Sequence, residues 1–494
     1  MIRSAESERS SVAAGVMNLK LKYAGEDALL FRGVSLSFRM GEHALLLGPS
    51  GCGKSTLLQV LSGLIPRTIE VPMIADEAIV PERWGYVFQD PDTQFCMPYA
   101  DEEMAFALEN LRVPREEMPE RIRGLLLKVG LDFPDPHVPI RSLSQGMKQR
   151  LAIASALATE PEVLFLDEPT ALLDEEGTEQ VWRTVREVAS RGVTLIVVEH
   201  KIEGIADLFD RVVVFGPSGE PIADGKPDEV FSARRRELDR FGIWHPGSWE
   251  SFDPGVGRKS DEAAGDRAPL LELDGFRGKR GGASVVEAPG AVVRPGDWIG
   301  IVGENGAGKS SLLLSIMRLI RTEGSCRLAG RELRRVEEMA ERASFVFQNP
   351  ELQFVTHSVR DEVEYSLPVD EVGREERRAR SERLMEEMQL TEVAERHPFQ
   401  LSTGQKRRLS VASAIIRGLP LLLLDEPTFG LDARNTFALL GLLERLRSEG
   451  TAILMVTHDR RIADRCCTAL WRIREGRLED AVRVSAPENL AASR

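Results

Sequence analysis

An internal repeat is the sequence feature that most constrains the fold. Two phosphate-loop-like segments begin at Gly48 and Gly303, and read GPSGCGKST and GENGAGKSS. Four further segments of the first half also return in the second: VFQDPDTQF as VFQNPELQF, LSQGMKQRLAIASAL as LSTGQKRRLSVASAI, LFLDEPTALLD as LLLDEPTFGLD, and VVEH as MVTH. Five motifs in one order, 255 to 259 positions apart, indicate a duplicated chain.

We predict a domain over 15–246 and a second over 269–480, joined by a flexible linker over 247–268. The linker is polar, rich in Gly and Pro, and without periodicity. The ends, 1–14 and 481–494, are predicted to be disordered tails. Short apolar runs such as HALLLG and EVLFLD alternate with longer amphipathic stretches in both halves. Unalternated apolar strands followed by helices indicate an α/β fold with a parallel sheet buried on both faces.

Composition argues against several classes of protein. The 494 residues carry 64 Lys and Arg against 78 Asp and Glu, a net charge of −14, so the basic footprint usual for nucleic-acid binding is missing. The five cysteines form no CxxC pair, which argues against a disulfide framework or a zinc site. We expect no signal peptide, because the start is polar, and no run approaches the roughly 18–20 apolar residues that cross a bilayer.

The segments at Gly48 and Gly303 match the pattern G-x-x-x-x-G-K-[ST], which binds nucleotide phosphates when it follows a strand and opens a helix. Glycines let successive backbone N–H groups point into one anion-sized hollow, and the following helix adds its positive end. Lys54 and Lys309 are predicted to reach the β- and γ-phosphates, and Ser55 and Ser310 to ligate Mg²⁺. The predicted ATP-binding residues of the two loops are Gly48, Pro49, Ser50, Gly51, Cys52, Gly53, Lys54, Ser55, Thr56, Gly303, Glu304, Asn305, Gly306, Ala307, Gly308, Lys309, Ser310 and Ser311.

Two Asp-Glu pairs end apolar strands downstream of these loops. Asp167 and Asp425 are predicted to hold the magnesium shell. Glu168 and Glu426 follow directly and can polarise the attacking water as general bases.

The LSxG motif just upstream of each Asp-Glu strand separates this chain from kinases and GTPases. The complete set of motifs resembles the ATP-binding cassette (ABC) superfamily over nearly the whole chain, apart from the linker and the ends. The resemblance implies two tandem P-loop NTPase cassettes. Each would contain a RecA-like parallel-sheet core, an antiparallel β subdomain and a helical signature subdomain.

The resemblance also implies roles for further residues. In that family two cassettes close head to tail around two ATP molecules, so each signature turn contacts the nucleotide held by the other half; the residues concerned are Ser144, Gly146, Ser402 and Gly404. Gln89 and Gln348 are similar to the glutamines that sense magnesium and link to the membrane partner. His200 and His458 resemble the histidines that contact the γ-phosphate, and each lies 32 residues after its glutamate. Tyr23 is expected to stack on the first adenine, with Phe276 as its weaker counterpart.

The two ATP sites are expected to be unequal. The usual family signature is LSGGQ, whereas the first copy has Gln145 and Met147 in LSQGM and the second has Thr403 in LSTGQ. Both copies keep the glutamate and the histidine, so we predict that both hydrolyse ATP at different rates.

Three classes of ABC protein compete: a transporter ATPase with a separate membrane subunit, a tandem ATPase acting on ribosomes, and a DNA-maintenance ATPase. A tandem ATPase acting on ribosomes would carry a longer charged linker, and a DNA-maintenance ATPase would carry coiled coils or zinc modules. The segments FQDPDTQF and FQNPELQF, with the acidic helices that follow, resemble the cassettes of energy-coupling factor (ECF) importers, and most of all the fused cassettes that import hydroxymethylpyrimidine (HMP) or thiamine.

That resemblance implies a transmembrane coupling subunit, a small substrate-binding membrane subunit, and a peripheral position on the cytoplasmic face of the membrane. The substrate stays open among thiamine, its precursor, other vitamins and metal ions. Five acidic residues after the glutamines either complement a helix dipole or receive basic side chains of the partner: Asp101, Glu102, Glu103, Asp361 and Glu362.

Overall fold

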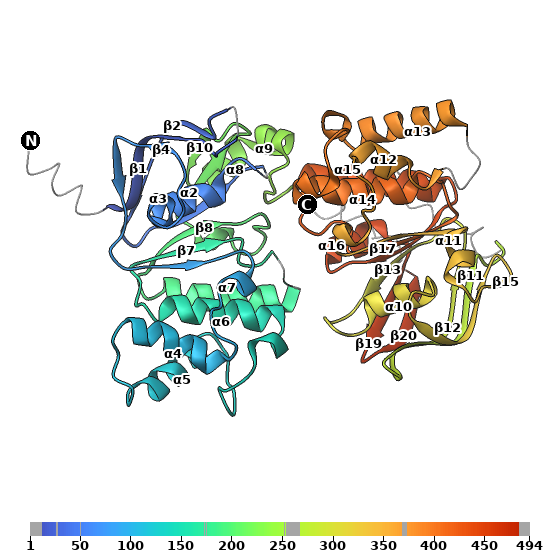
Figure 1. Ribbon diagram of the computed structural model, residues 1–494, viewed down its shortest axis with the longest axis horizontal. Helices are drawn as coiled ribbons and strands as arrows, with labels where there is room; N and C mark the ends of the chain where they lie inside the picture. The colour runs from blue at the N-terminus through green and yellow to red at the C-terminus, as the bar shows by residue number, and fades with distance from the viewer. Residues whose placement is uncertain are drawn as a thin grey trace, which may run out of the picture. The chain divides into compact units, whose positions relative to one another are not determined.

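The computed structural model describes residues 12–25, 28–49, 51–171, 173, 175–250, 252, 267–367 and 373–483. They divide into two compact units, with the boundary after Trp249 (Figure 1). Each unit is one half of the sequence repeat, and each has a parallel-sheet core, antiparallel strands and a helical segment. The predicted fold class, two α/β cassettes in tandem, is confirmed.

The core of the first unit is a six-stranded sheet in the order β10-β9-β3-β8-β7-β6. All neighbours are parallel except β10, which runs antiparallel to β9. The strands are β3 (His43–Leu47), β6 (Trp84–Val87), β7 (Val163–Asp167), β8 (Thr194–Val198), β9 (Arg211–Phe215) and β10 (Pro221–Gly225).

Both faces of this sheet are covered, as the unalternated apolar strands predict. Every residue of β7 and β8 is buried. Alternate residues face two different clusters: Leu164 and Leu166 pack in one, and Val163 and Phe165 pack in the other. A strand buried on both faces needs apolar residues at successive positions, which explains the runs LFLD and LIVV.

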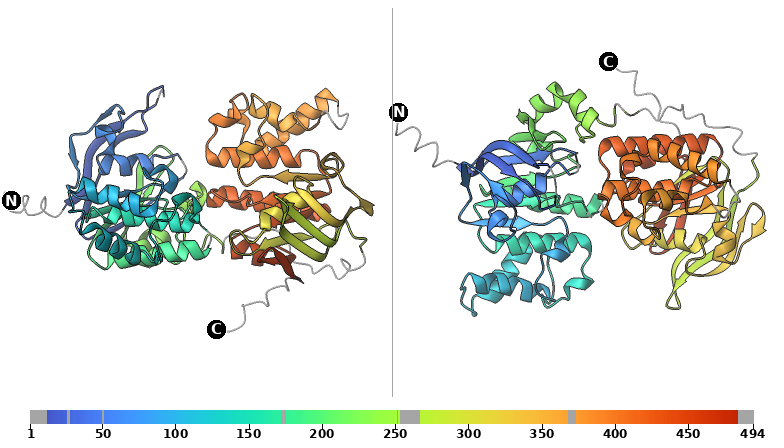
Figure 2. Two further views of the ribbon diagram at one scale, coloured as in Figure 1. Left: turned by 60° about the horizontal axis from the view of Figure 1, so that its bottom comes forward. Right: turned by 45° about the horizontal axis from the view of Figure 1, so that its top comes forward.

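The remaining strands of the first unit form a smaller antiparallel sheet, and helices surround the core. The antiparallel strands are β1 (Val12–Leu21), β2 (Phe31–Arg39), β4 (Met73–Ile74) and β5 (Glu77–Ile79). The helices are α2 (Lys54–Leu61), α3 (Leu64–Arg67), α4 (Ala100–Asn110), α5 (Met118–Lys128), α6 (Gln145–Leu157), α7 (Glu175–Ala189), α8 (Pro227–Ala233) and α9 (Arg235–Phe241). Helices α4 and α5 pack on α6 and form the helical subdomain (Figures 1 and 2).

In the second unit one continuous sheet of ten strands has the order β15-β14-β11-β12-β20-β19-β13-β18-β17-β16. The strands are β11 (Leu271–Arg280), β12 (Ala283–Val293), β13 (Trp298–Val302), β14 (Arg321–Leu328), β15 (Arg331–Glu332), β16 (Ala343–Val346), β17 (Leu421–Asp425), β18 (Ala452–Val456), β19 (Ala469–Arg474) and β20 (Arg477–Arg483). The helices are α10 (Lys309–Ile316), α11 (Val336–Ala340), α12 (Val359–Glu364), α13 (Arg374–Glu387), α14 (Thr403–Ile415), α15 (Ala433–Ser448) and α16 (Arg460–Cys466).

The two units differ at the junction between their antiparallel and parallel strands. In the second unit β12 pairs with β20 at Glu287 and Arg477, and the Glu287 amide donates to the Gly476 carbonyl at 2.6 Å. In the first unit a side chain crosses the junction, because Arg211 Nη1 on β9 donates to the Ser37 carbonyl on β2 at 2.8 Å. The junction is therefore backbone pairing in one half and a side-chain contact in the other.

The domain boundaries need three corrections. Strand β1 begins at Val12, so residues 12–14 belong to the first sheet rather than to the tail over 1–14. Trp249 is buried, and the first unit therefore extends past residue 246 into the predicted linker. Strand β20 continues to Arg483, three residues into the predicted tail over 481–494. Residues 1–11, 253–266 and 484–494 lie outside the described residues. Across the described part of the chain, every helix falls short of the length and apolarity needed to cross a membrane.

Candidate functional site

The loop before α2 and its repeat before α10 have the geometry of a phosphate cradle. Lys54 Nζ donates to the carbonyls of Gly48 at 2.8 Å and Pro49 at 3.0 Å. Lys309 Nζ donates to the carbonyls of Gly303 and Glu304, both at 2.7 Å. Each amine thus lies folded over its own loop, where a phosphate oxygen can replace the carbonyls as acceptor.

The glycine before each lysine is required by the backbone. Gly53 has φ 98° and Gly308 has φ 105°, in the left-handed region that favours glycine. A Cβ at Gly53 would lie 2.8 Å from the Phe31 ring, and one at Gly308 would lie 2.8 Å from the Val285 carbonyl oxygen. The loops can therefore turn into α2 and α10 only with glycine at these positions. Ser50, one of the predicted loop residues, lies outside the described residues.

A serine and an aspartate meet at the start of each loop helix. Ser55 Oγ donates to Asp167 Oδ1 at 2.8 Å, and Ser310 Oγ donates to Asp425 Oδ1 at 3.0 Å. Hydroxyl and carboxylate oxygens are hard ligands of the kind that Mg²⁺ prefers. Among the described residues no cluster of three or more His, Cys, Asp or Glu could hold a metal alone. The pairs therefore fit a magnesium ion that takes its other ligands from nucleotide phosphates and water.

Burial raises the pKa of both aspartates. It raises the pKa of Asp167 to about 6, against the hydrogen bond from Ser55. It also raises the pKa of Asp425 to about 6, against the hydrogen bond from Ser310. Burial favours the neutral form of a carboxyl group, and a bound cation would favour the charged form. A bound cation would therefore lower the pKa of both carboxyl groups and offset the effect of burial.

The next residue in each unit, Glu168 or Glu426, is held by a histidine. Glu168 Oε1 lies 2.9 Å from His200 Nε2, and Glu426 Oε1 lies 3.0 Å from His458 Nε2. Burial pushes the pKa of each glutamate up, but its histidine and its P-loop lysine outweigh burial, so each pKa is lowered. Both carboxylates are thus charged at neutral pH, as a general base must be.

Both glutamates also have a strained backbone. Glu168 has φ 47° and Glu426 has φ 49°, which side-chain-bearing residues rarely adopt. The amide of Glu168 donates to Val198 at 2.8 Å and that of Glu426 to Val456 at 3.2 Å, which holds this conformation against the next strand. Strain of this kind concentrates at functional sites.

The two predicted glutamines behave differently. Gln89 Nε2 donates to Glu168 Oε2 at 2.9 Å, which brings it into the first site. Gln348 is exposed, and among the described residues no hydrogen bond joins it to Glu426. The structure therefore joins Gln89 to the glutamate of its site, and the role of Gln348 stays a prediction.

The repeated sequence after each glutamine anchors that loop to the signature helix. Asp90 and Asn349 cap short 3₁₀ helices at Pro91–Thr93 and Pro350–Leu352. Lys148 on α6 pairs with Asp92 at 2.8 Å, and Lys406 on α14 pairs with Glu351 at 2.5 Å. Gln94 and Gln353 donate to carbonyls of the same helices, those of Ala152 at 3.1 Å and Ser410 at 2.8 Å. The motif thus couples the loop to the signature helix in both halves.

The signature serines begin their helices. Ser144 Oγ accepts from the Met147 amide at 3.3 Å, and Ser402 Oγ accepts from the Gln405 amide at 3.4 Å. In the second copy Gln405 also accepts from the Ser402 amide at 3.0 Å, a reciprocal capping box. Methionine cannot do this, so the departure at Met147 removes one bond from the first signature turn. Within each unit, no hydrogen bond between described residues links Ser144 or Ser402 to the P-loop.

Of the two aromatic residues proposed for the adenine, Tyr23 lies beside the first loop helix. Its hydroxyl is 2.9 Å from Thr56 Oγ1 on α2. The expectation for Phe276 was wrong, because that ring is fully buried in β11 with the Arg318 guanidinium 5.3 Å from its centre.

The strand register explains the error over Phe276. Leu21 pairs with Phe31, and Gly278 pairs with Val286. Phe31 and Val286 each precede their P-loop lysine by 23 residues, so the position that matches Tyr23 is Arg280.

Sequence reasoning missed three side chains that support the sites. Tyr86 is buried and donates its hydroxyl to Asp167 Oδ2 at 3.2 Å, and the matching residue is Phe345. Glu199, also buried, accepts from Thr170 Oγ1 at 2.7 Å and from the His200 amide at 2.8 Å. Arg407 on α14 is 2% exposed and donates to the Phe347 carbonyl at 3.0 Å. A polar residue inside an otherwise buried run was the available signal for Tyr86 and Glu199, whereas Arg407 is hidden in the charged run over 406–408.

The acidic residues after the glutamine loops have mainly internal partners. Glu103 and Glu362 are 3% exposed, and each accepts two backbone N–H groups of the preceding loop at 2.9–3.0 Å. Asp101 lies 3.1 Å from His137, and Asp361 accepts from Ser358 Oγ at 2.7 Å. Glu103 and Glu362 therefore each anchor the preceding loop, and contact of the five acidic residues with a partner's basic side chains stays a prediction.

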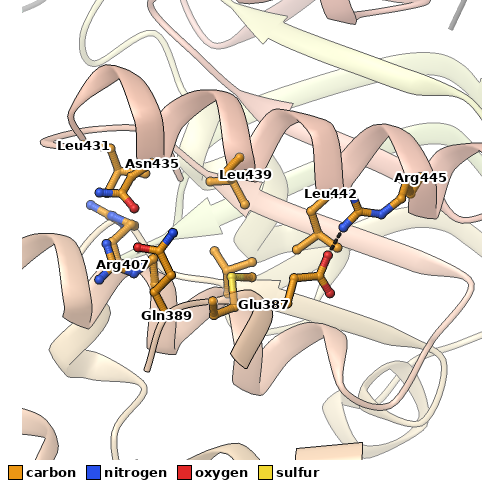
Figure 3. Close-up of a pocket in the computed structure, with 12 residues that line it drawn as sticks. Glu387, Gln389, Arg407, Leu431, Asn435, Leu439, Leu442 and Arg445 are labelled. Carbon is orange, nitrogen blue, oxygen red and sulfur yellow. Dashed lines mark ion pairs between the residues drawn. The ribbon is translucent and has the colours of Figure 1, made fainter. Parts of the chain in front are cut away.

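A cavity of about 210 Å³ is lined by residues of the second signature helix, α14, and of α15. Gln389, Arg407 and Asn435 surround one end of it, and Leu439 and Leu442 lie along α15 (Figure 3). The ion pair between Glu387 and Arg445 lies at the other end. The cavity leaves free space beside the buried arginine.

The sequence profile of the ABC transporter family matches residues 31–171 and 290–429. A Bacillus subtilis protein named as a provisional HMP/thiamine import ATP-binding protein, YkoD, is 35% identical over 480 residues, which cover 90% of this chain and 86% of that protein. An ABC transporter ATP-binding protein of Methanosarcina acetivorans, also provisionally named, is 30% identical and covers 99% of this chain and 89% of its own.

Among solved structures, an archaeal ribosome recycling factor, aABCE1, in complex with the stalk protein aP1, is similar with a TM-score of 0.66. The match has 21% identity, covers 94% of this chain and 90% of that one, and shows the fold alone. The profile match and the two relatives, each aligned over most of the chain, agree with the paired sites described above. The chain belongs to the ABC transporter family of ATP-binding proteins and carries two cassettes of that family.

Proposed function

We propose that each cassette hydrolyses ATP and that hydrolysis drives an importer of the ECF type. The ATPase part rests on one observation: each unit brings a P-loop lysine, a Ser–Asp pair and a Glu–His pair together. Neither half has lost one of these groups.

In this proposal Lys54 and Lys309 bind the phosphates, and Ser55 with Asp167 and Ser310 with Asp425 hold Mg²⁺. When bound, Mg²⁺ supplies positive charge that stabilises the charge on the phosphates during transfer. Glu168 and Glu426 orient and deprotonate the attacking water, and His200 and His458 hold these carboxylates in place. Tyr23 stacks on the adenine of the first site.

Family resemblance supports a further step, in which each site is completed by the signature turn of the other cassette. Ser144→Arg should then lower hydrolysis at the site of Lys309 and leave that of Lys54 less affected. The reverse pattern is expected for Ser402→Arg. If each change impaired only the site of its own half, this part of the proposal would fail.

The importer part is supported by exposed apolar side chains beside the second glutamine loop. Leu352 is 71% exposed, Val355 is 62% exposed and Phe399 is 50% exposed; we call these three the Q-loop face. The Phe399 ring packs against Phe354, with centroids 6.2 Å apart. Exposed apolar residues gathered in this way are typical of protein interaction sites. A transmembrane coupling subunit is the proposed partner, which would hold the chain at the cytoplasmic face of the membrane.

The name of the Bacillus subtilis relative supports HMP or thiamine as the substrate. A small membrane subunit would bind it, since the proposed role of this chain is to supply the energy. The competing function is a tandem ATPase that acts on ribosomes without a membrane partner.

Nucleotide binding tests the ATPase part. The wild-type chain should bind two ATP per chain in calorimetry, and Lys54→Ala or Lys309→Ala should each bind one. The double variant should bind none. A stoichiometry of two in either single variant would exclude the corresponding loop as a site.

Co-purification tests the importer part. The chain should co-purify with membrane subunits encoded beside it, and Leu352→Asp with Val355→Asp should weaken that association while two ATP still bind. Cells lacking the chain should lose uptake of labelled HMP or thiamine. Co-sedimentation with ribosomes, without association with membrane subunits, would favour the competing function.

A further inference from the structure

The two signature helices differ at one buried position. Gln149 on α6 and Arg407 on α14 each follow the signature serine by five residues, and each is 2% exposed. Gln149 Nε2 donates to the Phe88 carbonyl at 3.4 Å, whereas Arg407 Nη1 donates to the Phe347 carbonyl at 3.0 Å. The same backbone position is thus held by a neutral amide in the first unit and by a guanidinium in the second.

These carbonyls directly precede the glutamines of the two sites. A charged donor makes a shorter and stronger hydrogen bond than a neutral one. The second glutamine loop is therefore held more firmly to its signature helix than the first.

The guanidinium also changes the charge of the second site. Burial lowers the pKa of Arg407 to about 10, against the attraction of Glu426 and Asp425, so the group remains charged at neutral pH. Its Nε has no hydrogen-bond partner among the described residues. The pKa of Glu426 is lowered by His458, Lys309 and Arg407, whereas the pKa of Glu168 is lowered by His200 and Lys54. The carboxylates of the second site are thus exposed to the charge of one buried cation that has no counterpart at Gln149 in the first unit.

We infer that Arg407 is a positioning residue that makes the second site bind Mg²⁺-free ATP more tightly than the first. This inference rests on the proposed ATP sites. A buried cation attracts ATP more strongly when magnesium does not neutralise the phosphates, and it repels magnesium itself. The two sites should therefore differ in how much Mg²⁺ improves nucleotide affinity, with the smaller improvement at the second.

The test measures ATP affinity by calorimetry, in EDTA and in Mg²⁺, with one site at a time. Lys54→Ala leaves the second site, and Arg407→Gln in that background should weaken binding in EDTA about fivefold and binding in Mg²⁺ about twofold. Arg407→Lys keeps the charge and should restore most of the affinity. Lys309→Ala leaves the first site, where Gln149→Arg should strengthen binding in EDTA.

Glutamine is the residue of the first unit at this position, where it donates to the matching carbonyl, so Arg407→Gln should fold. Melting curves check this. If the variant unfolds, ATP binding by Gln149→Arg alone tests the inference. Equal weakening in EDTA and in Mg²⁺, or none in either, would overturn the inference. If the Lys54→Ala parent bound no ATP at all, the proposed second site would fail instead.

Discussion

The two cassettes share the groups that would touch ATP and differ in the groups that hold them. The Ser–Asp distances are 2.8 and 3.0 Å, and the Glu–His distances are 2.9 and 3.0 Å. Around this common geometry Tyr86 is replaced by Phe345, Glu199 by Thr457 and Gln149 by Arg407. The difference teaches that a duplicated site can keep its chemistry while its hydrogen-bonding support and local charge diverge.

The catalytic glutamates should give the largest difference. Glu168→Gln and Glu426→Gln should each lower turnover at their own site by about 100-fold or more. Glu168 is bonded to both His200 and Gln89, and Glu426 to His458, so Glu426 is the less restrained base. We therefore expect Glu426→Gln to remove the larger share of ATPase activity, measured as phosphate release. Equal losses of ATPase activity in the two variants would show that the two sites do not differ in function.

The aspartates should instead show that the two cassettes are alike. Because each folded-state pKa is raised to about 6, the folded chain keeps a proton that the unfolded chain releases. Stability should therefore fall as the pH rises from about 4 through 6, by about 2–3 kcal/mol for each aspartate. Asp167→Asn and Asp425→Asn should each remove the pH-dependent stability that comes from its own aspartate, and by equal amounts. Urea unfolding in EDTA measures this. A stability difference from wild type that is the same at pH 4 and pH 8 would contradict this prediction.

Removal of the Tyr86 hydroxyl should make the first site resemble the second. Tyr86→Phe deletes the buried donor to Asp167 and should lower the free energy of unfolding by about 1–2 kcal/mol. Urea unfolding at pH 8 in EDTA measures the loss. Phe345→Tyr in the second unit is the matched control, because it adds a hydroxyl where Asp425 has one side-chain donor. An unchanged midpoint for Tyr86→Phe would mean that water replaces the hydroxyl at no cost.

The smallest expected difference lies in the helical subdomains. Asp101 lies 3.1 Å from His137 in the first unit, and at the matching positions of the second Arg360 and Glu395 form an ion pair, 3.0 Å apart. Exposed pairs of this kind contribute about 0.5 kcal/mol to stability. Double-mutant cycles on the two pairs, measured by urea unfolding, should therefore give coupling energies that differ by no more than about 0.5 kcal/mol. A coupling energy above about 1 kcal/mol for one pair alone would contradict this prediction.

Sequence alone located the repeated motifs because each has a fixed place on a strand end or helix start. Lys54, Asp167 and His200 follow apolar strands at set distances, so spacing was enough to predict them. Tyr86 and Arg407 were missed because their contacts join positions about 60 to 80 residues apart. Phe276 was misplaced because counting back from the P-loop ignores the strand register. Strand ends at Val12 and Arg483 were read as tails, because their polar neighbours hide the pairing.

The junction between the two sets of strands has a mechanical consequence. Where β12 pairs with β20, backbone hydrogen bonds join the antiparallel and parallel strands of the second cassette into one sheet, so a force on the outer strands would be transmitted to the core through the backbone. In the first cassette the Arg211 guanidinium bridges the two sheets. A single substitution at Arg211 would therefore weaken the mechanical connection in the first cassette, whereas the backbone pairing of the second depends on no one side chain.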